Sequence, residues 1–208
     1  MPEAQVLESQ LLKARLRKEL RSRRRQMSCA DHALRSNLAA SAITRLAAFK
    51  PAARVAVYLP FDRETNTAAL LVAARRRRVR IYVPVIDSKR YRRLRFYPLC
   101  GKTRRGVFGI SVPHGAARRR AVAPRWFDLI VVPLVGVDAG GYRLGMGGGF
   151  YDRALAFRRN RRGWRGPWLV GLAFQCQRAD SVFPQSHDVR LDALATETGL
   201  QLFTGDPT

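Results

Sequence analysis

An apolar run from Asp128 to Val137 leads directly into a glycine-rich segment, and this junction limits the folds open to the chain. A nearly continuous apolar run is typical of a strand that is covered on both faces of a sheet. The segment at 140–152 has the sequence Gly-Gly-Tyr-Arg-Leu-Gly-Met-Gly-Gly-Gly-Phe-Tyr-Asp, and a helical pattern follows it. A strand, a glycine-rich turn and a helix in this order predict a ligand site at the carboxyl end of the sheet.

Further periodic segments surround this central strand. Apolar residues at helical spacing predict helices over 7–27, 31–50, 68–74 and 150–158. Pro51 is expected to end the second of these helices, and Thr65 or Asn66 is expected to cap the third. Extended patterns predict strands at 55–59, 79–86, 94–99 and 168–174, with one or two more in 189–203. The segment 101–124 is expected to be a long irregular excursion that could cover a site. The sequence therefore predicts an α/β fold, a three-layer α/β/α sandwich with a largely parallel central sheet.

The chain length suits one substantial core, so we expect a single domain over 1–208 with the helical segment 7–50 packed on the α/β core. No apolar run approaches the roughly 20 residues of a membrane helix, and the N-terminus lacks the apolar region of a secretory signal. The scattered Cys29, Cys100 and Cys176 indicate neither a disulfide framework nor a paired metal site. We expect a monomeric cytoplasmic protein with free thiols.

The formal charge of +24 is the most conspicuous compositional property, with 39 lysines and arginines against 15 aspartates and glutamates. Such an excess attracts nucleic acids without regard to their sequence. The arginine runs nevertheless fall where solvated faces and helix ends are expected, at 21–25, 75–78, 118–120 and 158–162. We therefore favour solvated surfaces, with nonspecific attraction of anions as the alternative.

The glycine-rich segment belongs to neither of two common phosphate-binding patterns. Phe150 occupies the third glycine position of a dinucleotide-binding fingerprint, and no Gly-Lys-Ser/Thr ends the segment as in a P-loop. Its glycines still allow the backbone to close on phosphate oxygens at the start of a helix. Because Arg143 and Asp152 bracket it with the charges of a metal-nucleotide site, we favour nucleotide binding over a merely flexible turn.

The segment from Arg143 to Arg153, preceded by Val132-Pro-Leu-Val-Gly-Val-Asp138, resembles the signature of the 5-formyltetrahydrofolate cyclo-ligase family. Other motifs of that family are matched in the same order by 13–17, 58–64, 108–110, 173–175 and 187–192. One departure is Gly148, where many relatives carry lysine. At this position we expect the loop backbone and Arg143 to take over phosphate binding.

The resemblance implies magnesium- and ATP-dependent cyclisation of 5-formyltetrahydrofolate to 5,10-methenyltetrahydrofolate, with release of ADP and phosphate. In that reaction the formyl oxygen attacks the γ-phosphate, the 10-position nitrogen adds to the activated carbon, and phosphate leaves. ATP and 5-formyltetrahydrofolate, including polyglutamylated forms, are thus the expected small-molecule partners. The alternative is a basic, noncatalytic nucleic-acid-binding protein on the same scaffold.

The same resemblance implies the site residues. Those for ATP are Lys13, Arg17, Arg143, Leu144, Gly145, Met146, Gly147, Gly148, Gly149, Phe150 and Tyr151. Those for folate are Leu59, Glu64, Met146, Gly147, Gly148, Gly149 and Phe150. Arg143 and Tyr151 are expected to be catalytic, and Asp152 and Asp188 to bind Mg²⁺. On local grounds alone, Lys13 and Arg17 form a solvated helix face, Glu64 and Asp152 are helix N-terminal carboxylates, and Asp188 is a turn residue.

Overall fold

The computed structural model describes residues 3–88, 93–116, 120–159 and 166–203. Its centre is a seven-stranded sheet in the order β11-β10-β9-β6-β1-β2-β3. These strands are β1 (Arg54–Ala56), β2 (Arg80–Ser88), β3 (Arg93–Pro98), β6 (Leu129–Pro133), β9 (Trp168–Leu172), β10 (Ala193–Thr196) and β11 (Gly199–Leu202). Only the edge strands β3 and β11 are antiparallel to their neighbours. The predicted α/β fold with a largely parallel sheet is confirmed.

Strand β6 lies at the middle of the sheet, between β1 and β9. Leu129 and Val131 enter a core shared with the two helices on one side of the sheet, whereas Ile130 and Val132 enter a second core on the other side. The predicted burial on both faces is therefore confirmed. The strand is shorter than predicted because it ends at Pro133, which has no backbone N–H to donate. The chain then forms a small ribbon of β7 (Gly136–Val137) and β8 (Arg143–Leu144).

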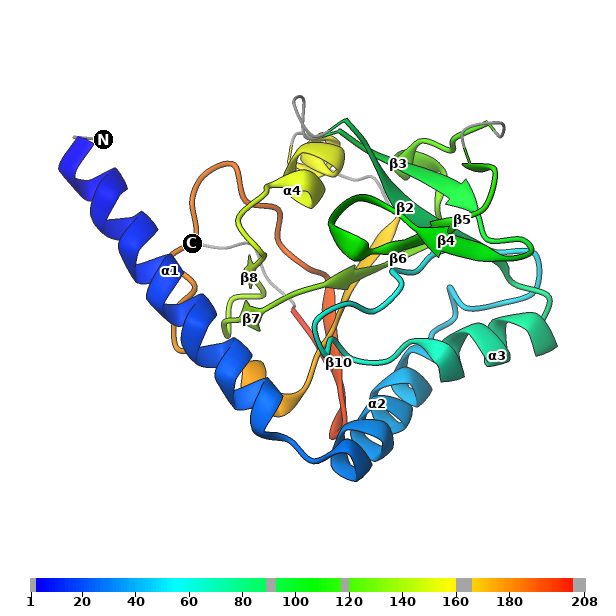
Figure 1. Cartoon of the computed structure of the whole chain (residues 1–208), viewed down its shortest axis with the longest axis horizontal. Coiled ribbons are helices and arrows are strands. Elements are labelled where there is room, and N and C mark those ends of the chain that lie inside the picture. Colours follow the sequence, from blue (N-terminus) through cyan, green and yellow to red (C-terminus); the bar gives the residue numbers. More distant parts are fainter. Residues whose placement is uncertain (1–2, 89–92, 117–119, 160–165, 204–208) are drawn as a thin grey trace.

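Three helices and one short turn of helix surround the sheet: α1 (Glu3–Gln26), α2 (Cys29–Thr44), α3 (Ala68–Arg76) and α4 (Phe150–Ala154). In Figure 1, α2 and α3 lie below the sheet, α4 lies above it, and the long α1 runs beside the β7–β8 ribbon. This arrangement confirms the three predicted layers. Within the described ranges, no helix is both long and apolar enough to cross a membrane.

Several helix ends differ from the sequence-based expectations. Helix α2 starts after Ser28, whose Oγ accepts the backbone N–H of Asp31 at 3.0 Å, but it ends at Thr44, well before Pro51. The N-cap of α3 is Thr67, so the predicted cap was wrong, although Asn66 Oδ1 accepts the N–H of Ala68 at 2.8 Å. Helix α4 is shorter than predicted, and a 3₁₀ turn over Ala156–Arg158 continues it.

The segment 101–124 contains regular structure, so the expected irregular excursion was partly wrong. Strands β4 (Thr103–Arg105) and β5 (Ser111–Pro113) form an antiparallel hairpin. The N–H of Val122 then donates to the carbonyl of Phe96 at 2.8 Å, which joins the segment to β3. The residues 117–119 lie outside the described part, as do 160–162 of the last arginine run.

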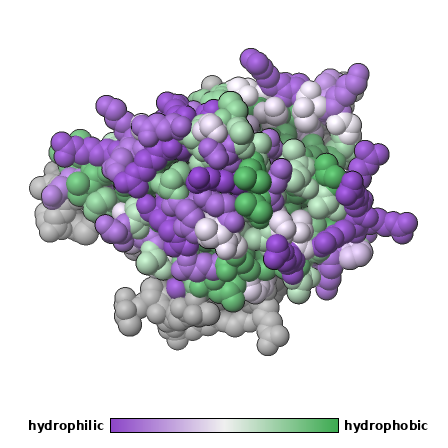
Figure 2. Space-filling model, turned by 90° about the horizontal axis from the view of Figure 1, so that it is seen from below, coloured by the Kyte–Doolittle hydropathy of each residue, from purple (hydrophilic) through white to green (hydrophobic). Residues whose placement is uncertain are grey.

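Helix α1 is attached to the sheet by its apolar stripe. Leu20 is 1% exposed, and a Cβ on Gly136 of β7 would lie only 2.4 Å from Leu20 Cδ1. The arginine run 21–25 is not simply solvated as expected, because Arg24 is 1% exposed and hydrogen-bonded to another segment. Figure 2 shows a face where hydrophilic side chains project at the edges and hydrophobic residues gather between them.

We predict that Leu20→Ala lowers the free energy of unfolding by about 2–5 kcal/mol, because the lost methyl groups leave a cavity between α1 and β7. The matched control is Leu11→Ala on the same helix, where the side chain is 61% exposed and the expected change stays within about 0.5 kcal/mol. Urea unfolding followed by circular dichroism measures both. Equal losses in the two variants would contradict this account of how the helix is attached.

Candidate active site

Two cavities lie against the segment that joins β8 to α4. The apolar cavity, of about 470 Å³, is lined by Tyr58, Leu59, Phe61, Glu64, Pro84, Ile86, Leu94, Val107, Ile110, Met146, Phe150 and Tyr151, among others. The polar cavity, of about 570 Å³, is lined by Gln10, Lys13, Arg17, Arg143, Leu144, Gly145, Gly147, Gly149, Asp152, Gln185, His187 and Asp188. Every sequence-predicted ATP and folate residue except Gly148 lines one of these two cavities.

The glycine-rich loop forms a shared wall between the two cavities. Gly145, Gly147 and Gly149 line the polar cavity, whereas Met146 and Phe150 line the apolar one. Gly147 and Gly149 have φ angles of 92° and 62°, a region that favours glycine. Four residues of this loop, at 145 and 147–149, are glycines, so backbone makes up most of the wall.

The ring of Phe150 lies next to Gly148, the position where many members of the family carry lysine. A Cβ there would lie 2.6 Å from the ring of Phe150, so this ring occupies the direction that a longer side chain would take. Two guanidinium groups lie beside the loop backbone: Arg17 Nε donates to the carbonyl of Gly145 at 2.8 Å, and Arg153 donates to that of Gly148. Arg17 and Arg153 are therefore the cations that contact this loop directly.

Helix α1 contributes the predicted cations to the polar cavity. Lys13 Nζ lies 3.4 Å from Asp188 Oδ2. Partial burial lowers the pKa of the Arg17 guanidinium, and the charge of Asp188 opposes that shift. Both residues were read locally as a solvated pair, but the helix directs them at the loop and at Asp188. The positive charges of Lys13 and Arg17 therefore face the polar cavity, where they would attract phosphate groups.

The two predicted metal-binding aspartates face the same cavity from different segments. Asp152 Oδ1 accepts from Arg143 at 2.6 Å and from the N–H of Val189 at 3.5 Å, which places it beside the residue that follows Asp188. Asp188 Oδ2 accepts the N–H of Gln185 at 2.8 Å. Arg143 also donates to the carbonyl of Val189 at 2.6 Å and is only 7% exposed. Arg143 thus ties the start of the loop to the segment that carries Asp188.

Three ionisable groups that line the apolar cavity, Tyr58, Glu64 and Tyr151, have raised pKa values. Burial raises the pKa of Glu64 to about 7, although a hydrogen bond from the N–H of Phe61 and the charge of Arg24 act against it. Burial, reinforced by the charge of Glu64, also raises the pKa of Tyr151 well above its ordinary value. At neutral pH, Tyr151 is consequently a protonated phenol and Glu64 is only partly ionised.

The hairpin β4–β5 forms part of the wall of the apolar cavity through Arg104, Arg105, Val107, Ile110 and Val112. The excursion that the sequence indicated as a cover thus does border a site. Arg104 and Arg105 are exposed as well as lining the cavity, so positive charge borders a mainly apolar space.

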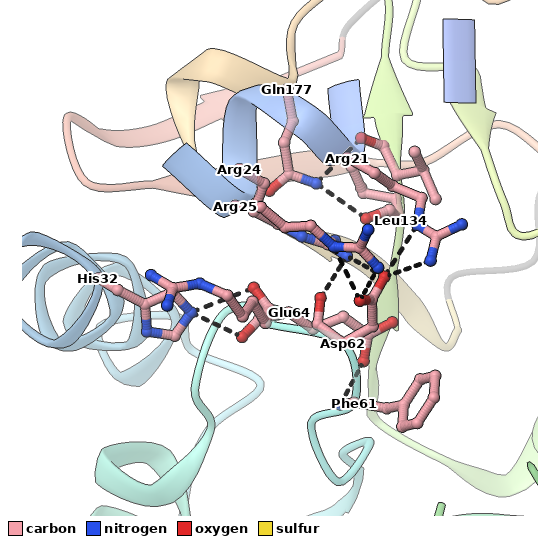
Figure 3. Close-up of polar contacts among 11 residues, drawn as sticks. Arg21, Arg24, Arg25, His32, Phe61, Asp62, Glu64, Leu134 and Gln177 are labelled. Carbon is pink, nitrogen blue, oxygen red and sulfur yellow. Dashed lines mark hydrogen bonds and ion pairs between the residues drawn. The ribbon is translucent and has the colours of Figure 1, made fainter. Parts of the chain in front are cut away.

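Sequence reasoning missed the residues that hold the loop 61–64. His32 Nε2 lies 3.1 Å from the Arg63 carbonyl oxygen and 3.2 Å from that of Glu64. Three arginines of α1 surround Asp62 in the same region (Figure 3). Helical spacing from Lys13 and Arg17 places those arginines on a related face of α1, but no local pattern identifies Asp62 as their partner.

We predict that Glu64 makes wild-type stability depend on pH. Because its pKa is about 7 in the folded chain and near 4.5 when unfolded, the folded state binds more protons between these values. The free energy of unfolding therefore falls as pH rises through this window, by roughly 1.4 kcal/mol per unit of pKa shift. Glu64→Gln should flatten this decline in urea unfolding from pH 4.5 to 8. Glu19→Gln controls for the loss of one carboxylate, and parallel curves for wild type and Glu64→Gln would disprove the assignment.

Known proteins resemble this chain over most of its length. The curated 5-formyltetrahydrofolate cyclo-ligase of Haemophilus influenzae is 32% identical over 184 residues, which cover 84% of this chain and 94% of that protein. The Escherichia coli K12 protein of the same name is 31% identical over 181 residues, covering 85% and 96%. The solved structure of Aquifex aeolicus 5,10-methenyltetrahydrofolate synthetase superposes with a TM-score of 0.76 at 27% identity and covers 95% of each chain.

The match to the family as a whole spans both cavities. Residues 10–197, from the first turns of α1 to the end of β10, match the profile of the 5-formyltetrahydrofolate cyclo-ligase family. The matched range includes the glycine-rich loop, the cations of α1, the loop 61–64 and both aspartates of the polar cavity. The chain therefore belongs to the 5-formyltetrahydrofolate cyclo-ligase family.

Proposed function

We propose that this protein catalyses ATP-dependent cyclisation of 5-formyltetrahydrofolate to 5,10-methenyltetrahydrofolate, with release of ADP and phosphate. One observation carries the proposal: a single glycine-rich loop separates an apolar cavity from a cationic one. Transfer of a phosphoryl group to a formyl oxygen requires the formyl group of the folate and the triphosphate to meet across a short distance. Both cavities are within the size range of small-molecule sites.

The residues of the polar cavity would bind ATP, and those of the apolar cavity would bind the folate. In the polar cavity, Lys13 and Arg17 would neutralise the triphosphate and orient the γ-phosphate towards the loop. In the apolar cavity, Leu59, Met146 and Phe150 would pack on the folate, and the Glu64 carboxylate would accept hydrogen bonds from its pterin ring.

The chemical step would occur at the glycine-rich loop, which lines both cavities. The formyl oxygen attacks the γ-phosphorus and ADP leaves, which gives an imidate phosphate. The 10-position nitrogen then adds to the formyl-derived carbon and releases its proton to water, and loss of phosphate leaves the methenyl bridge. Tyr151 borders the apolar cavity as a protonated phenol and would donate a hydrogen bond to the reacting groups. Arg143 would hold Asp152 in place during these steps.

The polar cavity also fits Mg²⁺ delivered with the nucleotide. Asp152 and Asp188 offer two carboxylates there, and the described residues contain no cluster of three or more candidate ligands. Such a set suits an ion that takes one or two carboxylates and completes its shell with phosphate oxygens and water. When bound, the ion would neutralise phosphate charge, and Asp152 and Asp188 would hold it.

An absorbance assay for 5,10-methenyltetrahydrofolate tests the proposal. We expect product from wild type only when ATP, Mg²⁺ and 5-formyltetrahydrofolate are all present. Arg17→Ala should raise KM for ATP at least about tenfold, because a charged hydrogen bond to phosphate contributes about 1.5–3 kcal/mol. Lys18→Ala is the control, since this neighbouring cation is exposed and does not line the polar cavity.

Two outcomes would count against the enzyme assignment. Wild-type protein that forms no ATP-dependent product would refute it. The same result together with RNA binding that weakens steeply with salt would favour the nucleic-acid-binding alternative. An unchanged KM for ATP in Arg17→Ala would refute the role of Arg17 alone.

We also propose that Arg104 and Arg105 attract the acidic tail of a folate that carries several glutamates. Wild type should then have a lower KM for triglutamylated than for monoglutamylated substrate. The double variant Arg104→Gln/Arg105→Gln should reduce this preference about two- to tenfold, as expected for exposed ion pairs. The charge-matched control is Arg75→Gln/Arg76→Gln on α3, whose residues line neither cavity. Equal preference in both double variants would rule out this tail site.

A further inference from the structure

We propose that Asp62 is a positioning residue that joins the cation-bearing helix α1 to the loop 61–64, so that nucleotide and folate strengthen each other's binding. This inference rests on the proposed function, because it assigns ATP to the polar cavity and folate to the apolar one. It adds a link between the two sites, carried by residues that border neither cavity: Arg21, Arg24, Arg25 and Asp62.

The contacts at Asp62 are unusually numerous for one carboxylate. Arg21 Nε donates to Oδ2 at 2.8 Å, and Arg24 donates to Oδ2 at 3.3 Å and to the backbone carbonyl of Asp62 at 2.7 Å. Arg25 donates to Oδ1 through two nitrogens. Figure 3 shows the three side chains reaching from the helix to this one residue. The side chain of Asp62 is 13% exposed and that of Arg24 is 1% exposed, so water competes little for the innermost contact.

The arginines occupy the same helix as the residues assigned to phosphate. Lys13, Arg17 and Arg21 follow one another at four-residue spacing, and Arg24 and Arg25 continue this row by three and four residues. Residues at these spacings lie along one face of a helix. Arg17 and Arg24 are about 10 Å apart along the axis, because each residue adds about 1.5 Å. A displacement of α1 at the polar cavity is therefore transmitted to the arginines at Asp62.

The other end of the link is a loop that depends on external support. Asp62 and Arg63 have φ angles of 48° and 57°, a region that non-glycine residues rarely adopt. Such conformations persist where surrounding contacts hold them. The residues on either side, Phe61 and Glu64, line the apolar cavity. The contacts made by Asp62 thus help to set the position of both side chains in that cavity.

Electrostatics favours Asp62 as the charged member of this link. Burial alone would raise the pKa of its carboxyl, but the hydrogen bonds from Arg25 and Arg21 outweigh burial and keep the pKa below its ordinary value. The carboxylate is consequently ionised at neutral pH. Arg24 also lies within the electrostatic reach of Glu64, so the same guanidinium acts on a carboxylate that borders the apolar cavity. Coupling through such a connection is reciprocal, since each ligand must change the other's affinity by the same factor.

Isothermal titration calorimetry tests the coupling directly. A nonhydrolysable ATP analogue with Mg²⁺ is titrated into the full chain with and without saturating 5-formyltetrahydrofolate, and the ratio of the two Kd values is the coupling factor. We expect a factor of about 5 to 150 for wild type and a factor near one for Asp62→Asn. The matched control is Glu19→Gln, which removes one carboxylate from an exposed ion pair with Arg23 on the same helix and should keep the wild-type factor.

Asp62→Asn leaves the buried Arg24 without its charged partner and could therefore impair folding. A second variant keeps the coupling measurable in that case. Arg25→Gln removes a half-exposed guanidinium and one side of the link, so circular dichroism should remain native and the coupling factor should be intermediate. A wild-type factor of one, or an unchanged factor in both variants, would overturn the inference even if both ligands bind. Failure of the wild type to bind either ligand would instead refute the proposed function, and the inference with it.

Discussion

Strand β6 can occupy the middle of the sheet because its alternating side chains enter two separate cores. The strand ends at Pro133, and this end sets where the β7–β8 ribbon and the glycine-rich loop begin. The loop contacts Arg17 of α1 on one side, and its Met146 and Phe150 line the apolar cavity on the other. Both cavities therefore take their position from a strand that contributes no functional side chain apart from Pro133 at its end, which lines the apolar cavity.

Local signals made this central part predictable. The apolar run, the glycines and the helical pattern after them lie within about thirty consecutive residues, so sequence spacing alone indicates their order in space. The lengths of the elements were harder to obtain. Helical periodicity does not distinguish α4 from the 3₁₀ turn that follows it, and an apolar run does not reveal that Pro133 ends its ladder. These errors shifted boundaries without moving the site.

The grouping of distant residues could not be derived from local patterns. Lys13, Asp152 and Asp188 come from three separate segments, and only the resemblance to a family indicated that they belong together. The arginine run 21–25 shows the limit most clearly, because a solvated run and a run that surrounds one carboxylate have the same sequence. Which of the two forms depends on whether the loop 61–64 reaches the helix, and that depends on the packing of Leu20 against β7.

The excess of arginine gives each carboxylate unusual importance. With 39 lysines and arginines and only 15 aspartates and glutamates, most cations must be solvated, and the few that are buried share acidic partners. Asp152 accepts from Arg143, Asp188 pairs with Lys13, and Asp62 accepts from three arginines. In the proposed reaction Asp188 would exchange Lys13 for Mg²⁺ while Arg143 continues to hold Asp152, whereas Asp62 would keep its arginines and transmit the change. Carboxylates thus have two distinct roles in this chain, according to whether the cations they hold face a cavity or a loop.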